Sequence, residues 1–290
     1  MTSELAFIAA LRALATDPAA RHLEDDCAVL EIGGEALVLT HDAMVEGVHF
    51  PPNADPADVA WKLVATNISD LAAKGAEPVG VLLGYQLGDG DLRFVEGLRE
   101  ALDHYGVALL GGDTVGAAGP QHLGLTAIGR ATCRPVPSRG GSQDGDRIWL
   151  TGAVGAAMVG LEALRAGTGD GLAYRRPMAR LAEGLTLAPQ VTAMMDVSDG
   201  LLLDAWRMAR ASGVCLELDS TAVPLACPES RRSEALRWGD DYELLFTLPA
   251  ATDPGVAATC IGRVLEGPKG AIRLDGELFE SGENLGFEHH

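Results

Sequence analysis

Aspartates at six places in the sequence could bind divalent cations. Each place lies at an expected strand end or helix start, where a turn can direct side chains into a cleft. The six are Asp25-Asp26, Asp42, Asp70, Asp113 after Gly111-Gly112, Asp196 with Asp199, and Asp240-Asp241. Mg²⁺ bound to a nucleotide typically takes one or two carboxylates together with phosphate oxygens and water. Several separated aspartates could therefore hold several ions along one polyphosphate.

Each acidic site also has a simpler interpretation when it is taken alone. Asp199 before Gly200 fits a helix N-cap, and the Asp25-Asp26 pair is more typical of a solvated turn. An isolated histidine such as His49 is more typical of a structural strand end. Only the joint pattern of the six sites therefore indicates a metal site.

The sequence motifs of several other enzyme classes are missing. There is no GxxxxGK(S/T) loop, no protein-kinase glycine loop with its lysine and HRD, and no dinucleotide GxGxxG after a strand. GxSxG and HExxH are missing as well. A nucleotide would therefore be bound through metals and backbone amides, and no catalytic nucleophile is expected.

Composition narrows the possible partners and the cell compartment. The formal net charge of −19 argues against nucleic acids and anionic membranes. Five scattered cysteines without a CxxC pair are typical of reduced thiols. No signal-peptide pattern opens the chain, and no run reaches the ~18–20 apolar residues of a membrane span. We expect a cytoplasmic protein that binds neither nucleic acid nor membrane.

The residues around Asp70 predict one amphipathic helix over 61–75. Asp55 is its expected N-cap, Pro56 occupies the first helical position, and Gly75 ends it. Asp70 shares a stripe with Asn67 and Lys74, so burying it requires a compensating cation. Lys74 itself is expected to be a solvated charge that the helix dipole favours.

The remaining patterns predict a mixed α+β protein with two domains. Strands are expected at 22–32, 36–45, 79–87, 107–113, 122–131, 147–152, 191–196, 214–219, 242–249 and 259–264; helices at 2–15, 61–75, 92–106, 153–167, 175–188 and 200–213. The first half is therefore β-β-α-β-α-β-β after an opening helix, which differs from strict βαβ alternation. Pro, Gly and Ser concentrate in 133–146, so the domains are predicted at 1–133 and 134–290.

Seven segments carry a family resemblance, in order, across nearly the whole chain. They are EDDCAVL (24–30), THDAMVEGVHF (40–50), DPADVAWKLVATNISDLAAKGAEP (55–78), LLGGDT (109–114), GDRIWLTG (145–152), MDVSDGLLLDA (195–205) and GDDYELLFT (239–247). Together they closely resemble the thiamine-monophosphate kinases, whose superfamily includes aminoimidazole-ribonucleotide synthetase. The resemblance implies an N-terminal α+β domain that dimerises through its strands, a C-terminal α+β domain, and ATP in the cleft between them.

The resemblance also implies roles for particular residues in Mg²⁺-dependent transfer of the ATP γ-phosphoryl group to thiamine monophosphate. The implied Mg²⁺ ligands are Asp26, Thr40, His41, Asp42, Asp70, Asp113, Asp196 and Asp199. ATP contacts are implied for Gly112, Asp113, Ser198 and a linker arginine, placed at Arg134 with Arg139 as the alternative. His49 and Asp240 would contact the substrate, and Phe287 would stack near its ring. Catalysis would rest on positioning and metal ions.

Three positions depart from the usual family pattern. Glu24 replaces a glycine, His41 replaces a small hydroxyl residue, and Asp240 is one methylene shorter than the usual glutamate. His41 could bind metal through its backbone or its side chain. Two other functions stay open: a related ATP-dependent ligase or cyclase acting on a ribonucleotide, and a non-catalytic nucleotide- or metal-binding protein. A degenerate binder should have lost acidic sites, yet all six are present.

Overall fold

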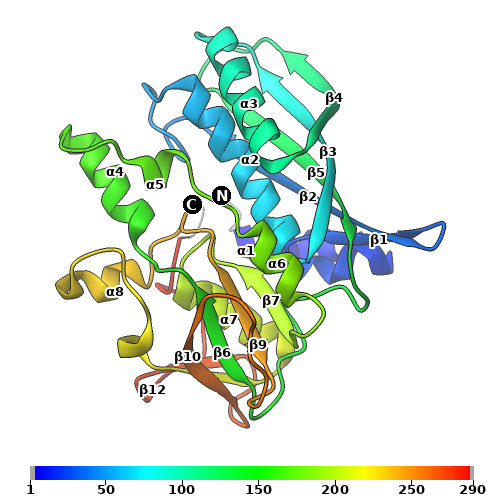
Figure 1. The fold of residues 1–290 in the computed structure, drawn as a ribbon, viewed down its shortest axis with the longest axis vertical. Coiled ribbons are helices and arrows are strands. Elements are labelled where there is room, and N and C mark those ends of the chain that lie inside the picture. Colours follow the sequence, from blue (N-terminus) through cyan, green and yellow to red (C-terminus); the bar gives the residue numbers. More distant parts are fainter. Residues whose placement is uncertain (1–3, 288–290) are drawn as a thin grey trace.

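The structure, a computed structural model, describes residues 4–287 and contains two sheets, one above the other in Figure 1. The first five strands are β1 (Ala28–Ile32), β2 (Glu35–Val45), β3 (Ala76–Gln86), β4 (Ala108–Val115) and β5 (His122–Ala131). They form a sheet of order β1-β2-β5-β3-β4, in which only β3 and β4 are parallel. This parallel pair exists because α3 (Asp91–Tyr105) provides the crossover.

The second sheet has seven strands in the order β12-β11-β8-β10-β6-β9-β7. Its strands are β6 (Arg147–Thr151), β7 (Ala193–Asp196), β8 (Cys215–Leu218), β9 (Leu244–Leu248), β10 (Ala258–Leu265), β11 (Ala271–Leu274) and β12 (Glu277–Phe279). Its helices are α4 (Ala156–Ala166), α5 (Leu172–Arg175), α6 (Leu181–Leu187), α7 (Leu201–Ser212) and α8 (Arg232–Ala235). The mixed α+β class is therefore confirmed.

The predicted order β-β-α-β-α-β-β of the first half is confirmed, after the helix α1 (Glu4–Arg12). Residues 2 and 3 of that predicted helix lie outside the described residues. The helix predicted over 175–188 is wrong: Pro177 separates α5 from α6, because proline cannot continue the helical hydrogen bonds. The short strands β11 and β12 and the helix α8 were not predicted.

Helix α2 (Pro56–Ala73) lies at the centre of the molecule and contacts both domains (Figure 1). Asp55 caps it, since its carboxylate accepts a 3.0 Å hydrogen bond from the Ala57 amide. Sixteen of its eighteen residues are buried, which is far more than one amphipathic face supplies. Its polar stripe contacts β2 through Asn67 and Asp70, and β7 of the C-terminal domain through Lys74. At Gly184 in α6 a Cβ atom would lie 2.1 Å from the Ala72 carbonyl oxygen, so only glycine permits this approach.

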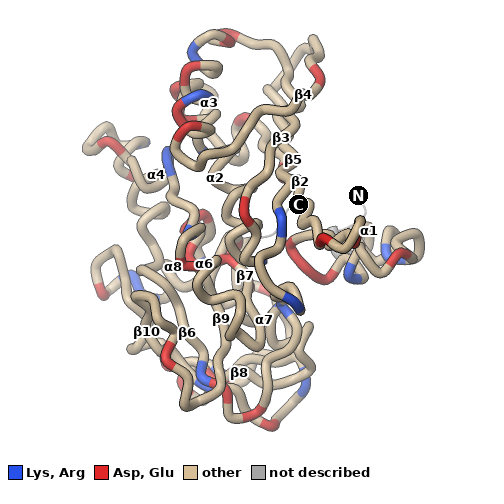
Figure 2. Tube along the Cα trace, turned by 45° about the vertical axis from the view of Figure 1, so that its right-hand side comes forward, with Lys and Arg blue, Asp and Glu red and all other residues tan. Residues whose placement is uncertain are grey.

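The charged residues are spread over both domains, without one long acidic run (Figure 2). No helix within residues 4–287 combines the length and the apolar character that crossing a membrane would require.

Candidate active site

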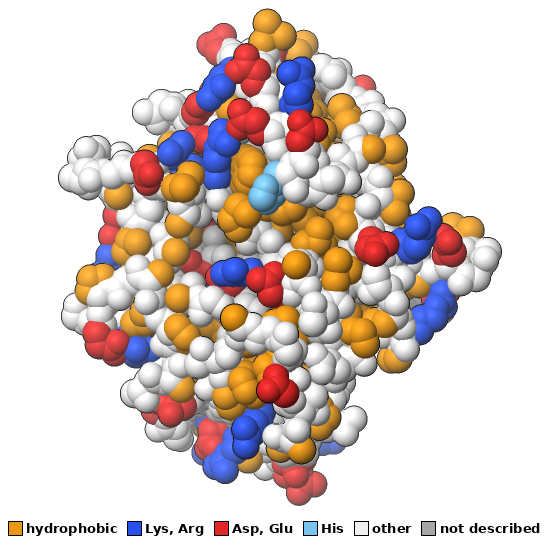
Figure 3. Space-filling model, viewed as in Figure 1, with side chains coloured by type: hydrophobic (Ala, Val, Ile, Leu, Met, Phe, Trp, Pro, Cys, Tyr) orange, Lys and Arg blue, Asp and Glu red, His pale blue; other side chains and the backbone are white. Residues whose placement is uncertain are grey.

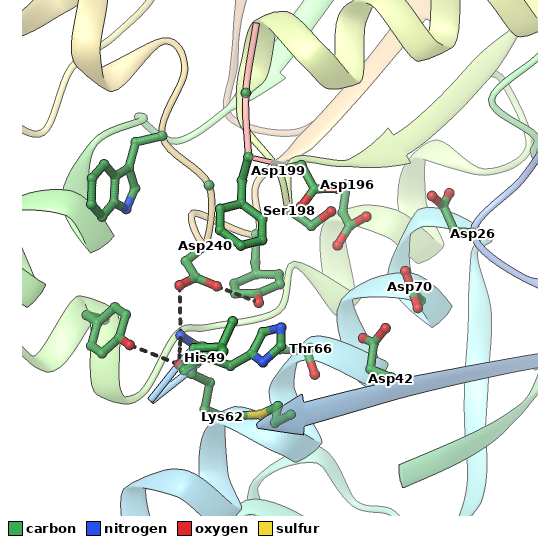
Figure 4. Close-up of a pocket in the computed structure, with 18 of the residues that line it drawn as sticks. Asp26, Asp42, His49, Lys62, Thr66, Asp70, Asp196, Ser198, Asp199 and Asp240 are labelled. Atoms are coloured by element: carbon green, nitrogen blue, oxygen red, sulfur yellow. Dashed lines mark hydrogen bonds and ion pairs between the residues drawn. The ribbon is translucent and has the colours of Figure 1, made fainter. Parts of the chain in front are cut away.

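A cavity of about 640 Å³ lies between α2 and β2 on one side and the loops of the C-terminal domain on the other (Figure 4). Predicted site residues line it from both domains: Asp26, Asp42, His49, Asp70, Asp196, Ser198, Asp199, Asp240 and Phe287. The cavity has an acidic end, where Asp26, Asp42, Asp70 and Asp196 lie close together. At the other end lie His49 and Asp240 (Figure 4).

The acidic end contains a cluster of three carboxylates. One oxygen each of Asp26, Asp70 and Asp196 lies within 4.8 Å of the others. These residues come from the loop before β1, from α2 and from the end of β7, so the fold gathers them from distant parts of the sequence. Burial raises the pKa of Asp196 to about 8, with the charge of Asp26 adding to the effect. Burial also raises the pKa of Asp70, together with the charges of Asp42 and Asp196.

These residues fit a hard divalent cation. Asp26 is paired with Lys74 and Arg139, but Asp70 and Asp196 form no ion pair within residues 4–287 and accept hydrogen bonds only from hydroxyl groups. Carboxylates in such surroundings are costly unless a cation compensates their charge, and carboxylate oxygens are the ligands that Mg²⁺ prefers. A cation that compensates the charge of Asp70 could therefore also be bound by the carboxylates of Asp26 and Asp196.

Hydroxyl groups orient two carboxylates of the cluster. The Thr40 hydroxyl donates to Oδ2 of Asp70, and the Ser69 hydroxyl donates to Oδ2 of Asp196 over 2.6 Å. The second bond joins α2 to β7 and therefore links the two domains at the acidic end. Asp42 lies beside the cluster on β2, and burial raises its pKa to about 6.

The side chains of Asp25, Asp26 and Lys74 are buried, so the predictions of a solvated turn and of a solvated lysine are wrong. The side chain of Lys74 is 0% exposed, and its Nζ lies 2.5 Å from Oδ1 of Asp25 and 2.5 Å from Oδ2 of Asp26. Nζ also donates to the Met194 carbonyl at 3.3 Å. Burial alone would raise the pKa of Asp25, but Lys74 and Arg21 outweigh it and lower that pKa well below its ordinary value.

The structure brings Arg139 into the cavity and keeps Arg134 out of it. Arg139 lines the cavity, and its Nε donates to Oδ1 of Asp26 over 2.7 Å. Arg134 is half-exposed, forms a 2.7 Å ion pair with Glu31, and donates to the Gly34 carbonyl. Of the two candidate arginines, Arg139 therefore lies in the cavity and Arg134 lies outside it.

Asp199 and Ser198 lie in the loop between β7 and α7 and line the cavity. Their backbone amides both donate to Oδ2 of the buried Asp204, at 3.0 and 3.1 Å. Asp199 also forms a 2.5 Å ion pair with Arg207. Asp204 and Arg207 thus hold the loop in place, and the sequence analysis did not identify either of them.

Gly112, Asp113 and His41 lie outside the lining of this cavity in the described chain. Gly112 and Asp113 are on β4, where every residue is exposed. The His41 side chain points to the face of β2 opposite Thr40, and its Nδ1 lies 2.9 Å from the Thr126 hydroxyl. Within one chain His41 could therefore reach the acidic end only through its backbone.

The opposite end of the cavity contains His49 and Asp240, with Lys62 and Tyr174 between the domains. Phe287 also lines the cavity, and its amide donates to the Asp199 carbonyl over 2.9 Å. The Val45 amide donates to Nδ1 of His49 over 2.9 Å, so the proton of the neutral imidazole is on Nε2. Lys62 and Tyr174 were not identified from the sequence. A signal existed for Lys62, because Lys62, Thr66 and Asp70 are spaced i, i+4 and i+8 and line one face of α2.

Comparison with known protein families shows which class of protein this chain belongs to. The family model for the AIR synthase related protein, N-terminal domain, matches residues 24–131, and the one for the C-terminal domain matches residues 143–275. The chain is thus a two-domain AIR synthase related protein.

Individual relatives show which family within this class the chain belongs to. The thiamine-monophosphate kinase of Escherichia coli K12 is 36% identical over 284 residues, 87% of each protein, and that of Methanospirillum hungatei is 35% identical over 92% of this chain and 93% of the relative. A solved structure described as AaThiL complexed with AMPPCP and TMP superimposes with a TM-score of 0.88 at 29% identity, covering 99% of this chain and 97% of that one. The chain belongs to the thiamine-monophosphate kinase family.

Proposed function

We propose that this protein phosphorylates thiamine monophosphate with ATP, giving thiamine diphosphate and ADP. The observation that carries the proposal is a single cavity with a three-carboxylate cluster at one end and His49 and Asp240 at the other. Such a cavity can hold a polyphosphate beside a second phosphorylated molecule. The curated relatives with this function span most of the chain, and one similar solved structure is described as a complex with AMPPCP and TMP.

The acidic end is the proposed place for several Mg²⁺ ions. Asp26, Asp70 and Asp196 would hold them, with Thr40, Asp42 and Asp199 nearby and the His41 carbonyl as a further oxygen donor. Bound Mg²⁺ would neutralise charge between two anions, which otherwise repel each other. Ser198 and Arg139 would contact ATP from the C-terminal side of the cavity.

The chain's own contribution to the transfer is positioning. The acceptor is a phosphate oxygen that is already ionised, so no side chain has to activate it as a nucleophile. In-line transfer requires instead that the two phosphates be held close together and away from water. The hydroxyl–carboxylate bonds of Thr40 and Ser69 and the buried Lys74–Asp25 pair keep the acidic end rigid before substrate binds.

We further propose a homodimer that forms through the N-terminal sheet, in the cytoplasm. Large apolar side chains are exposed on β3 and β4: Val79, Leu82, Leu109, Leu110 and Val115. Figure 3 shows hydrophobic side chains along the edge of the upper domain, where Figure 1 places β4. Exposed apolar surface of this kind favours association. In a dimer, Gly112 and Asp113 on β4 would lie at the boundary between two copies, where they could still contribute to ATP and metal binding.

A direct assay tests the proposed function. The purified protein is incubated with Mg²⁺, ATP and thiamine monophosphate, and the products are separated by chromatography. Equimolar thiamine diphosphate and ADP, with no turnover when EDTA is present, are the expected result. Turnover of a ribonucleotide without formation of thiamine diphosphate would instead favour a related ligase or cyclase.

A further inference from the structure

Lys62 is a buried cation that the proposed chemistry does not use. It lies on α2, is only 3% exposed, and lines the cavity at the end opposite the carboxylate cluster. Its Nζ donates to Oδ2 of Asp240 at 2.8 Å and to the His49 carbonyl at 3.2 Å (Figure 4). Nζ also lies 3.9 Å from the centre of the Tyr174 ring. An ammonium group has three donors, and these three contacts occupy them.

Because its donors are occupied, Lys62 is poorly placed to bind a phosphate itself. Its contacts instead reach both residues proposed to contact the substrate. Tyr174 strengthens the arrangement, since its hydroxyl donates to the same His49 carbonyl over 2.9 Å. His49 and Lys62 come from the N-terminal domain, while Tyr174 and Asp240 come from the C-terminal domain. Lys62 therefore joins the two domains across one end of the cavity.

Asp240 needs such support because its backbone conformation is unfavourable. Its φ angle is +68°, and Tyr242 two residues later has a φ of +52°, both in the left-handed region that non-glycine residues rarely adopt. Such residues persist when the surrounding contacts over-determine them. Lys62 contacts Oδ2 of Asp240, and the Tyr242 hydroxyl donates to Oδ1 over 2.9 Å. The carboxylate is thus held at both oxygens.

A carboxylate held in this way can still accept hydrogen bonds. Each carboxylate oxygen has two lone-pair positions, and Lys62 and Tyr242 use one on each oxygen. A substrate donor can take the remaining positions without first ordering the side chain, which reduces the entropy lost on binding. Asp240 has one methylene less than a glutamate, so its reach into the cavity depends strongly on where it is held.

We propose that Lys62 is a positioning residue: by fixing the Asp240 carboxylate and the His49 backbone, it sets the affinity of the cavity for thiamine monophosphate. This inference rests on the proposed function for the identity of the substrate. It assigns Lys62 to substrate binding and not to binding of ATP or metal, which occupy the other end of the cavity.

The test compares Lys62→Met with Lys269→Met. The chain has three lysines, and Lys269 is exposed in the turn between β10 and β11, so it provides a matched control. Methionine keeps the unbranched shape of lysine and removes the charge. We expect Lys62→Met to raise the KM for thiamine monophosphate, and its calorimetric Kd measured without ATP, by about tenfold or more, with the KM for ATP changed by less than about twofold. Lys269→Met should match the unsubstituted protein.

A double-mutant comparison shows whether Lys62 acts through Asp240. In an Asp240→Asn background, adding Lys62→Met should weaken binding of thiamine monophosphate by less than about twofold further, since the group that Lys62 holds is already changed. This pair removes both charges, so it also covers the case in which Lys62→Met alone fails to fold. Any of three results would overturn the proposal. Lys62→Met could weaken binding of thiamine monophosphate by the same factor in both backgrounds, it could leave the Kd unchanged, or it could raise the KM for both substrates equally.

Two different results separate the role of Lys62 from the proposed function. If the unsubstituted protein makes thiamine diphosphate and Lys62→Met binds thiamine monophosphate normally, only the role of Lys62 is refuted. If the unsubstituted protein binds thiamine monophosphate without turnover, the proposed function is refuted, while the calorimetric comparison still decides the role of Lys62.

Discussion

Nζ of Lys74 lies 2.5 Å from Oδ1 of Asp25, and the two side chains are 0% and 2% exposed. This ion pair connects the end of α2 to the loop before β1, directly behind the carboxylate cluster. Because Lys74 also donates to the Met194 carbonyl of β7, one ammonium group joins both domains to the acidic end of the cavity.

Lys74→Met should destabilise the fold. Removing Lys74 leaves Asp25 paired with Arg21 alone, and the loss of one partner of a buried ion pair costs up to about 3–5 kcal/mol. We expect a clear decrease in melting temperature, measured by circular dichroism in EDTA, while Lys269→Met leaves it unchanged. Equal melting temperatures for the two variants would show that Lys74 does not compensate Asp25.

Asp70→Asn should abolish most of the activity and leave the fold intact. The substitution removes one of three clustered carboxylates, so we expect the rate to fall by about a hundredfold or more, as is typical when charge stabilisation of a transferred group is lost. In EDTA its melting temperature should equal or exceed that of the unsubstituted protein, because like-charge repulsion decreases. The exposed Asp103→Asn in α3 is the control. Ordinary turnover with unchanged Mg²⁺ dependence would refute the role of Asp70 as a ligand.

Stability without metal should decrease as pH rises. Burial raises the folded-state pKa of Asp42 to about 6 and of Asp196 to about 8, from an ordinary 3.8. Between pH 3.8 and about 8 the folded state therefore holds more protons than the unfolded state, so its stability decreases with pH across that window. In EDTA the melting temperature should be lower at about pH 8.5 than at about pH 6.

Added Mg²⁺ should reverse this decrease. Because Mg²⁺ binds the ionised carboxylates, it should raise the melting temperature more at the higher pH. Scanning fluorimetry at both pH values, with Mg²⁺ and with EDTA, measures the two shifts. A larger Mg²⁺ shift at the lower pH would contradict the assignment of the cluster as a metal site.

Arg139 and Arg134 provide a matched pair for the ATP site. Arg139→Met should raise the KM for ATP by about tenfold, which corresponds to about 1.4 kcal/mol of binding, because it removes a guanidinium that lines the cavity. Arg134→Met should change the KM for ATP little, since Arg134 pairs with Glu31 at the surface. Steady-state kinetics with varied ATP distinguishes the two, and the reverse result would restore Arg134 as the contact.

Leu82→Glu should dissociate the proposed dimer. Leu82 is 39% exposed on β3, so a charge there is tolerated in a single chain but would be buried in an interface formed by this sheet. Sedimentation velocity should show a dimer for the unsubstituted protein and a monomer for this variant. Leu92→Glu, at a position 83% exposed on α3, is the control. A monomeric unsubstituted protein would contradict the proposal directly.

Local patterns in the sequence determined much of the fold. The Asp55 cap, the position of Pro56 and the apolar spacing predicted α2, and alternation with turn residues predicted the strands of both sheets. These features depend on neighbours within a few residues, so they can be identified from the sequence. The prediction is wrong at 175–188, because Pro177 interrupts the helical pattern, and it misses the short strands β11 and β12, which give little local pattern.

Burial and proximity of charged groups were decided only by the tertiary structure. Lys74 has the position of a solvated helix-end residue, but Asp25, 49 positions earlier, and the C-terminal domain close over it. Lys62 and Asp240 are 178 positions apart and form an ion pair across the two domains. The sequence determined which residue types were available for metal and phosphate chemistry. The packing of two domains around α2 decided which of them meet, because desolvation and charge pairing depend on contacts between distant segments.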